Sequence, residues 1–154
     1  MISTFPNRQR SNRSKSFPLL VVEDNKDHQL LIGYSLRAKI PQAQPVFASS
    51  VKEALIHLKI TFDKQEDFPQ LVLLDLYLPD PTLGWQLLKD IRTHYPRLPV
   101  IILSSHQDTD IVETAYELGA HSFINKPMDL DEWECYFRVL NEYWLGTVTL
   151  PSVS

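Results

Sequence analysis

Short apolar segments alternate with longer helical patterns along most of this chain. Such alternation is typical of βαβ units, in which helices cover a parallel sheet. Two of the segments, Leu71–Leu74 and Val100–Leu103, are apolar at every position, which predicts central strands buried on both faces. The sequence therefore predicts an α/β fold with five parallel strands and five helices. We expect strands near 18–23, 44–48, 70–75, 99–103 and 121–124, and helices near 26–39, 51–63, 84–95, 107–118 and 129–144.

Length and composition fit one compact domain without covalent cross-links. The 154 residues are 44% hydrophobic, and a chain of about 150 residues buries roughly 70% of the surface that it exposes when unfolded. Cys135 is the single cysteine, so no internal disulfide can form. No segment approaches the roughly 18 consecutive apolar residues of a membrane span, and the N-terminus lacks the apolar stretch of a secretory signal. We therefore expect a cytoplasmic protein with no membrane partner.

The charge of the chain is unevenly distributed. Residues 1–16 contain no acid and four basic side chains, Arg8, Arg10, Arg13 and Lys15. The rest of the chain holds the other 11 of the 15 basic residues and all 19 acidic residues, which argues against a nucleic-acid-binding surface on the folded part. A polar segment with dispersed charges is typical of a disordered leader. We expect a disordered basic tail over 1–16, a folded domain over 17–145 and a C-terminal tail over 146–154.

Polar and charged side chains follow four of the predicted strands, at the point where each strand ends. They are Glu23 and Asp24 after the first, Asp75 after the third, Ser104 after the fourth and Lys126 after the fifth. The carboxyl ends of parallel strands meet at one edge of the sheet, where open α/β sheets place their functional crevice. We therefore expect these side chains to form one site. Three carboxylates beside one ammonium suit a divalent metal and a phosphoryl group.

The motifs at these strand ends resemble those of the receiver domain of two-component response regulators. The resemblance covers residues 17 to about 142 and consists of four motifs in order, Val22–Asn25, Leu74–Pro79, Ile102–Ser105 and the segment from Gly119 through Phe123 to Pro127. It implies a flavodoxin-like receiver fold, a doubly wound sheet with strand order 2-1-3-4-5. The segments 64–69, 143–145 and 149–151 are also similar to stand-alone regulators associated with cyanobacterial and other bacterial phytochromes.

The resemblance implies a role for each residue of the predicted site. Asp75 would be the phosphorylated nucleophile, which takes its phosphoryl group from a sensor histidine kinase, and the subgroup suggests a kinase of phytochrome type. One Mg²⁺ would be held by Glu23, Asp24, Asp75 and the backbone carbonyl of Tyr77. Lys126 and Ser104 would bind phosphoryl oxygens beside Asp75. Beyond Mg²⁺-dependent self-phosphorylation and autodephosphorylation, no enzymatic activity is expected.

The resemblance also implies how such a site would signal. Ser104 and Phe123 would act as the switch, and phosphorylation would alter the face made by the last two helices and the strand between them. No DNA-binding domain is expected, since only residues 146–154 follow the last helix. That helix carries a second apolar stripe besides its core stripe, formed by Tyr136, Val139 and Tyr143. We expect this stripe to contact a second copy of the protein, giving a homodimer, or the C-terminal tail.

One position departs from the family pattern, and several histidines stand outside it. The family usually has a glycine eight residues after the phosphorylated aspartate, whereas here Gly84 comes nine residues after Asp75, behind a loop predicted over 80–83. Plain surface or packing roles are expected for four histidines, His28, His57, His94 and His121.

Three other functions compete with a phosphorylated receiver. A phosphatase of the haloacid dehalogenase type needs a second aspartate two residues after the first, where this chain has Tyr77. A flavodoxin-like electron carrier needs a Ser/Thr/Gly-rich phosphate loop after the first strand, where this chain has Asp24–Asp27. The third is a receiver fold that no longer takes up phosphate and acts only as an interaction module. All the expected site residues are present, which argues against this last alternative, and an absence of Mg²⁺ binding would favour it.

Overall fold

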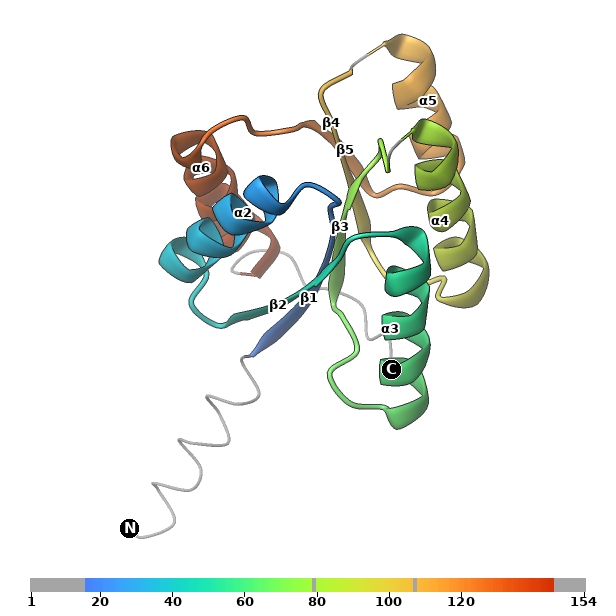
Figure 1. The fold of residues 1–154 in the computed structure, drawn as a ribbon, viewed down its shortest axis with the longest axis horizontal. Coiled ribbons are helices and arrows are strands. Elements are labelled where there is room, and N and C mark those ends of the chain that lie inside the picture. Colours follow the sequence, from blue (N-terminus) through green and yellow to red (C-terminus); the bar gives the residue numbers. More distant parts are fainter. Residues whose placement is uncertain (1–15, 79, 107, 146–154) are drawn as a thin grey trace, which may run out of the picture.

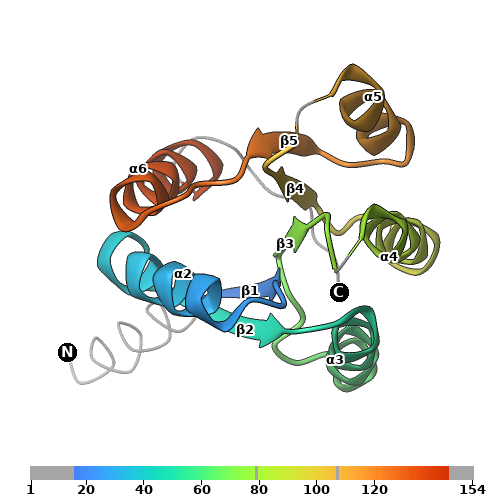
Figure 2. The same ribbon diagram turned by 45° about the horizontal axis from the view of Figure 1, so that its top comes forward.

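The fold is a single parallel sheet between two layers of helices. The computed structural model describes residues 16–145 apart from 79 and 107, so the predicted tails, except for Ser16, lie outside the described residues. Figure 1 shows the sheet among its helices, and the strand order β2-β1-β3-β4-β5 can be followed in Figure 2. Both the sheet and its order are confirmed, and each strand lies within one residue of its predicted range. The strands are β1 (Phe17–Val22), β2 (Ala43–Ala48), β3 (Leu71–Asp75), β4 (Val100–Ser104) and β5 (Ser122–Asn125).

Helices cover both faces of the sheet. Helices α2 and α6 lie on one face and α3, α4 and α5 on the other, as is clearest in Figure 2. Among the described residues, no helix is long and apolar enough to cross a lipid bilayer. The helices are α2 (Lys26–Lys39), α3 (Val51–Lys64), α4 (Pro81–His94), α5 (Thr109–Glu117) and α6 (Leu130–Leu140), and α6 continues into a π-helical turn, η1 (Asn141–Leu145).

The central strands are buried on both faces, as their apolar runs predict. In β3, Val72 and Leu74 pack in the core under α3, α4 and α5, while Leu71 and Leu73 pack in the core under α2 and α6. All four side chains are completely buried. The carboxyl end of β3, which carries Asp75, is therefore fixed by packing from both layers.

Two helix boundaries differ from the prediction by more than two residues. Helix α4 begins at Pro81 rather than near residue 84, because Asp80 caps it by accepting a hydrogen bond from the Thr82 amide (2.8 Å). A proline at the first helical position loses no hydrogen bond, so the segment predicted as a loop starts the helix. The last helix stops being α-helical at Leu140 and continues as η1, where the Asn141 side chain donates to the carbonyl of Lys39.

Gly84 lies inside α4 against the segment that follows Asp75. A Cβ atom at this position would lie 2.2 Å from the backbone oxygen of Leu76, far inside van der Waals contact. The glycine therefore permits α4 to pack directly on the β3–α4 connection, which supports the carboxyl end of β3 from one side.

This close approach predicts opposite effects of alanine at two helical glycines. Gly84→Ala should lower the free energy of unfolding by about 1–3 kcal/mol, because backbone atoms would have to move. Gly33→Ala is the matched control in α2, where the new Cβ would meet only the Phe47 ring at 3.7 Å. It should raise stability by up to about 1 kcal/mol through helix propensity. Urea denaturation measures both, and equal effects of the two substitutions would contradict this account of Gly84.

Candidate phosphoacceptor and metal site

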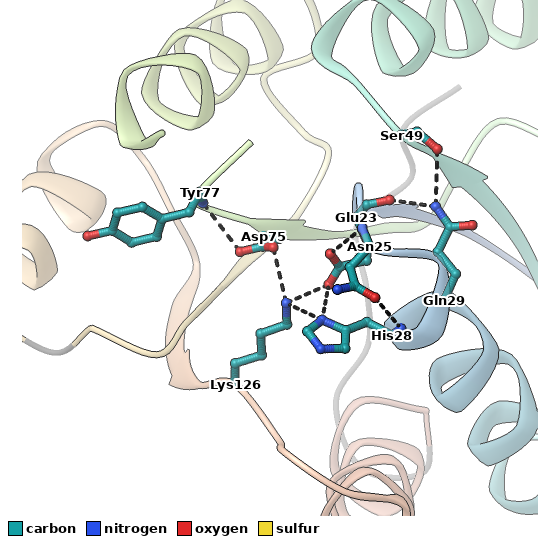
Figure 3. Close-up of polar contacts among 8 residues, drawn as sticks. All are labelled: Glu23, Asn25, His28, Gln29, Ser49, Asp75, Tyr77 and Lys126. Carbon is teal, nitrogen blue, oxygen red and sulfur yellow. Dashed lines mark hydrogen bonds and ion pairs between the residues drawn. The ribbon is translucent and has the colours of Figure 1, made fainter. Parts of the chain in front are cut away.

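The loop between β1 and α2 is held by hydrogen bonds within and around it. Asn25 caps α2, since its side-chain Oδ1 accepts from the backbone amide of His28 at 3.1 Å. The backbone amide of Asn25 donates to Glu23 Oε2 at 3.0 Å. Gln29 Nε2 donates to the backbone oxygen of Glu23 and, at 3.2 Å, to Ser49 Oγ. Figure 3 shows this network beside the carboxyl ends of the strands. The acidic pair Glu23 and Asp24 is therefore fixed relative to the sheet.

A buried ion-pair cluster lies at the centre of the site. The Nζ atom of Lys126 is 2.6 Å from Glu23 Oε1 and 3.1 Å from Asp75 Oδ2. All three residues are buried, with exposed fractions of 1% for Glu23 and 6% each for Asp75 and Lys126. The structure thus brings together side chains from the ends of β1, β3 and β5, as the sequence predicts (Figure 3). One ammonium faces two carboxylates, so negative charge is in excess.

This imbalance affects the three groups differently. Burial raises the pKa of the Asp75 carboxyl to about 6, the nearby charge of Lys126 opposes this rise, and Glu23 adds to it. Burial also disfavours ionisation of Glu23, but the hydrogen bond and charge of Lys126 outweigh it and lower the pKa of that carboxyl. Burial opposes the charge of Lys126 as well, yet the two acids raise its pKa. Asp75 is therefore the carboxylate whose charge the site stabilises least.

Three carboxylates converge in a way that fits a divalent cation. Glu23, Asp24 and Asp75 each offer an oxygen within 4.8 Å of the others, and Asp24 is exposed, so the group is open to solvent. Glu23 Oε1 is buried, and two nitrogen atoms lie near it, Lys126 Nζ at 2.6 Å and His28 Nδ1 at 3.4 Å. Hard oxygen ligands with room for water are what Mg²⁺ and Mn²⁺ bind. The excess negative charge and this donor set fit such an ion.

Three more of the predicted residues, Tyr77, Ser104 and Phe123, lie outside the ion-pair cluster. The Tyr77 amide donates to Asp75 Oδ1 at 3.3 Å, and the Tyr77 ring lies 4.5 Å from that of His106 between centroids. Ser104 is buried, and its Oγ donates to the His106 carbonyl and accepts from the His106 amide, both at 3.0 Å. Phe123 is partly buried on β5 against the core under α3, α4 and α5.

Sequence reasoning missed His28 as a member of this site. Its Nδ1 lies 2.9 Å from Lys126 Nζ and 3.4 Å from Glu23 Oε1, as Figure 3 shows. The only signal in the sequence is its place in the first turn of a helix that starts directly after the acidic pair. Contact with Lys126, 98 residues away, follows from the fold.

The geometry agrees with comparisons to known proteins. Residues 19–136 match the family model of the response regulator receiver domain. The chain belongs to this receiver family. Among curated relatives, the receiver is similar to the response regulator Rcp1 of Synechocystis, with 28% identity over 87% of this chain and 92% of the relative. The DNA-binding transcriptional regulator NtrC of Proteus hauseri is 45% identical over 42% of this chain.

Solved structures extend this similarity to three dimensions. The phosphorylated cyanobacterial phytochrome response regulator RcpA matches with a TM-score of 0.76 and 30% identity, over 89% of this chain and 99% of that one. The Mn²⁺-bound form of Rcp1 matches with a TM-score of 0.71 and 27% identity, over 87% and 98%. The matched segment spans only 13% of the length of NtrC. The receiver is thus similar over nearly full length to regulators associated with phytochromes, and to a small part of larger regulators.

The raised pKa of Asp75 makes stability depend on pH in a defined direction. Its value of about 6 in the folded protein lies above the ordinary value of 3.8, so the folded state binds this proton more tightly than the unfolded chain does. The resulting stabilisation is present below about pH 4 and is lost as the pH rises through about 6. Asp75→Asn removes the buried charge. It should therefore raise the free energy of unfolding by about 1 kcal/mol more at pH 8 than at pH 5.

Urea denaturation in the presence of a metal chelator measures this difference. The matched control is Asp108→Asn, since Asp108 is exposed and makes no side-chain capping bond. A gain from Asp75→Asn that is the same at both pH values would contradict the assignment of a poorly stabilised charge to Asp75.

Proposed function

We propose that this receiver is a phosphoacceptor response regulator, in which Asp75 takes a phosphoryl group from a sensor histidine kinase. The observation that carries the proposal is the buried Asp75 carboxylate, raised in pKa and facing the Lys126 ammonium at 3.1 Å. A basic, poorly compensated carboxylate is a good nucleophile once the repulsion from the incoming phosphoryl oxygens is relieved. The module that acts without phosphorylation is not favoured, because the residues that phosphoryl transfer needs are assembled at one point.

In the proposed transfer, an oxygen of Asp75 attacks the phosphorus atom of a phosphohistidine. The new O–P bond forms as the N–P bond breaks, and the imidazole nitrogen of the kinase keeps the electron pair of that bond. Lys126 leaves Glu23 and donates to a phosphoryl oxygen, which compensates the charge that Asp75 gains. Glu23, Asp24, Asp75 and the Tyr77 carbonyl would hold Mg²⁺, which neutralises negative charge at the reacting centre when bound.

The switch proposed for this receiver starts at Ser104. Its Oγ is bonded to both backbone groups of His106, so binding a phosphoryl oxygen would break these bonds and draw the β4–α5 loop toward Asp75. Phe123, on the neighbouring strand, would then turn inward. The face of α5, β5 and α6 would change in response.

An apolar groove beside the site supports a protein partner. It has a volume of about 420 Å³ and is lined by Leu30, Leu31 and Tyr34 of α2, Leu130 of α6 and Asp27. Leu30 and Tyr34 are 71% and 64% exposed, and apolar groups exposed in this way mark protein contacts. We assign this groove to the kinase, expected in the cytoplasm and of phytochrome type, because RcpA is a phytochrome response regulator.

The transfer is tested by intact mass after incubation with acetyl phosphate. Wild type should gain one phosphoryl group in the presence of Mg²⁺ and none in chelator, because without the metal the repulsion between the Asp75 carboxylate and the phosphoryl oxygens is not relieved. Asp75→Asn should gain none under either condition, and Asp108→Asn should behave as wild type. A phosphoryl group that is retained in Asp75→Asn, or no uptake by wild type from either acetyl phosphate or a sensor kinase, would overturn the proposal.

We also propose a homodimer through the outer face of α6 and η1. Val139 and Tyr143 are 50% and 55% exposed, whereas Tyr136 is half-buried and its ring lies 5.5 Å from that of Phe137. The predicted second stripe is therefore reduced to its two outer members, Val139 and Tyr143. Two exposed apolar side chains at this spacing support contact with a second copy.

Sedimentation velocity checks the proposed dimer. Val139→Ser combined with Tyr143→Ser should shift the protein from dimer to monomer, because the substitutions remove exposed apolar area at the contact. Ile56→Ser is the matched control, since Ile56 is 48% exposed on the distant helix α3. A double variant that sediments like wild type would rule out this face.

A further inference from the structure

The contact between His28 and Lys126 determines how the imidazole ring is used. The Lys126 ammonium has three N–H donors and no acceptor, and three atoms surround it, namely Glu23 Oε1 at 2.6 Å, His28 Nδ1 at 2.9 Å and Asp75 Oδ2 at 3.1 Å. Nδ1 of His28 must therefore accept, and the ring carries its proton on Nε2. The same nitrogen lies 3.4 Å from Glu23 Oε1. These two atoms are both acceptors, and the Lys126 ammonium is the donor group that they share.

Metal binding would engage the carboxylates of Glu23 and Asp75 but would leave the His28 imidazole free to contact Lys126. Among the described residues, the oxygens that lie within 4.8 Å of one another belong to Glu23, Asp24 and Asp75, so the imidazole stands outside the candidate metal ligands. A cation that binds those oxygens competes with Lys126 for Glu23 and Asp75. The lone pair on His28 Nδ1 stays available to the ammonium.

We propose that His28 is a positioning residue, which holds the Lys126 ammonium beside Asp75 when Glu23 turns to the metal. This inference rests on the proposed phosphoryl transfer and names a residue that sets its rate. Lysine has a long and flexible side chain, and its amine can point in many directions once a partner is lost. A fixed neutral acceptor removes most of these alternatives without adding negative charge next to the phosphoryl group.

The position of His28 suits this role. Its backbone amide is bound by the Asn25 side chain at the N-terminus of α2, so the ring projects from a rigid helix start. Its side chain is 37% exposed, whereas that of Lys126 is 7% exposed. A partly exposed ring on a rigid helix start thus contacts a buried amine.

The kinetic test compares two substitutions at His28 with a control at a distant histidine and with a variant that lacks Lys126. His28→Ala removes the acceptor and should slow phosphoryl uptake from acetyl phosphate about tenfold, the effect expected for losing one hydrogen bond to a charged group. His28→Asn places an amide oxygen near the position of Nδ1 and should restore most of the rate. His94→Ala, at an exposed histidine of α4, should have no effect. In a Lys126→Met background, His28→Ala should cause no further loss, because the two residues act through one contact.

Metal affinity separates this role from metal ligation. Binding of Mn²⁺ to the protein without phosphodonor, followed by the electron paramagnetic resonance signal of the free ion, should be the same for wild type and His28→Ala. Weaker binding in His28→Ala would make His28 a metal ligand and overturn the proposal, as would an equal rate loss in the Lys126→Met background.

A spectroscopic test is independent of phosphorylation. Long-range ¹H–¹⁵N correlation of the imidazole nitrogens in metal-free protein, at mildly alkaline pH, should show His28 protonated on Nε2 and unprotonated on Nδ1. The Nδ1 resonance should move in Lys126→Met and not in Asp108→Asn. A proton on Nδ1, or an Nδ1 resonance that ignores Lys126, would overturn the proposal even where phosphoryl uptake is normal. If wild type takes up no phosphoryl group, the proposed function fails, and this spectrum still decides whether His28 holds Lys126.

Discussion

The site depends on one buried interaction, the contact of the Lys126 ammonium with the carboxylates of Glu23 and Asp75. Moving a charged group from water into a protein interior costs roughly several kcal/mol for each ion, even after the protein relaxes around it. One cation between two anions cannot repay this cost completely. The deficit falls on Asp75, whose pKa rises to about 6, while Glu23 stays well compensated. The least stable charge of the cluster is thus located on the residue that the proposed chemistry uses. A ligand that brings positive charge compensates the excess negative charge of the cluster.

The sheet determines that these groups meet at all. β1 and β3 are neighbours, so Glu23 and Asp75 arrive side by side, but β5 is separated from β3 by β4. The Lys126 side chain therefore has to cross the end of β4 to reach Asp75. Ser104, at this end, is small and buried, and its hydroxyl is turned toward the backbone of His106. A large side chain in its place would obstruct the path of the lysine. The same position thus serves the geometry of the ion pair and, in the proposed mechanism, the response to phosphorylation.

The sequence predicts the features of the site that depend on local patterns and on general rules for parallel sheets. Apolar runs identify β3 and β4, and the rule for parallel sheets brings Glu23, Asp75 and Lys126 to one edge. The start of α4 is also encoded locally, since Asp80 followed by Pro81 is a helix-starting pair, although the sequence prediction assigns residues 80–83 to a loop. The end of α6 could not be predicted from local sequence. Apolar periodicity continues beyond Leu140, and the turn there is held by Asn141 contacts to Lys39 and Gln42, about a hundred residues away in sequence. His28 was missed for the same reason, because nothing near it in sequence reveals its contact with Lys126.

The hydrogen bonds of Ser104 give the proposed switch its direction. In the resting arrangement the hydroxyl makes two neutral hydrogen bonds to the His106 backbone, both at 3.0 Å. A phosphoryl group adds about −1.5 to −2 charges at Asp75, and a hydrogen bond to a charged acceptor is roughly twice as strong as a neutral one. The hydroxyl therefore exchanges two moderate bonds for one strong bond, and the balance is close. Because the two arrangements differ little in energy, small contributions decide between them. Contacts made by α5, β5 and α6 with a partner would then shift the same equilibrium that phosphorylation shifts, and partner binding and phosphoryl lifetime become linked.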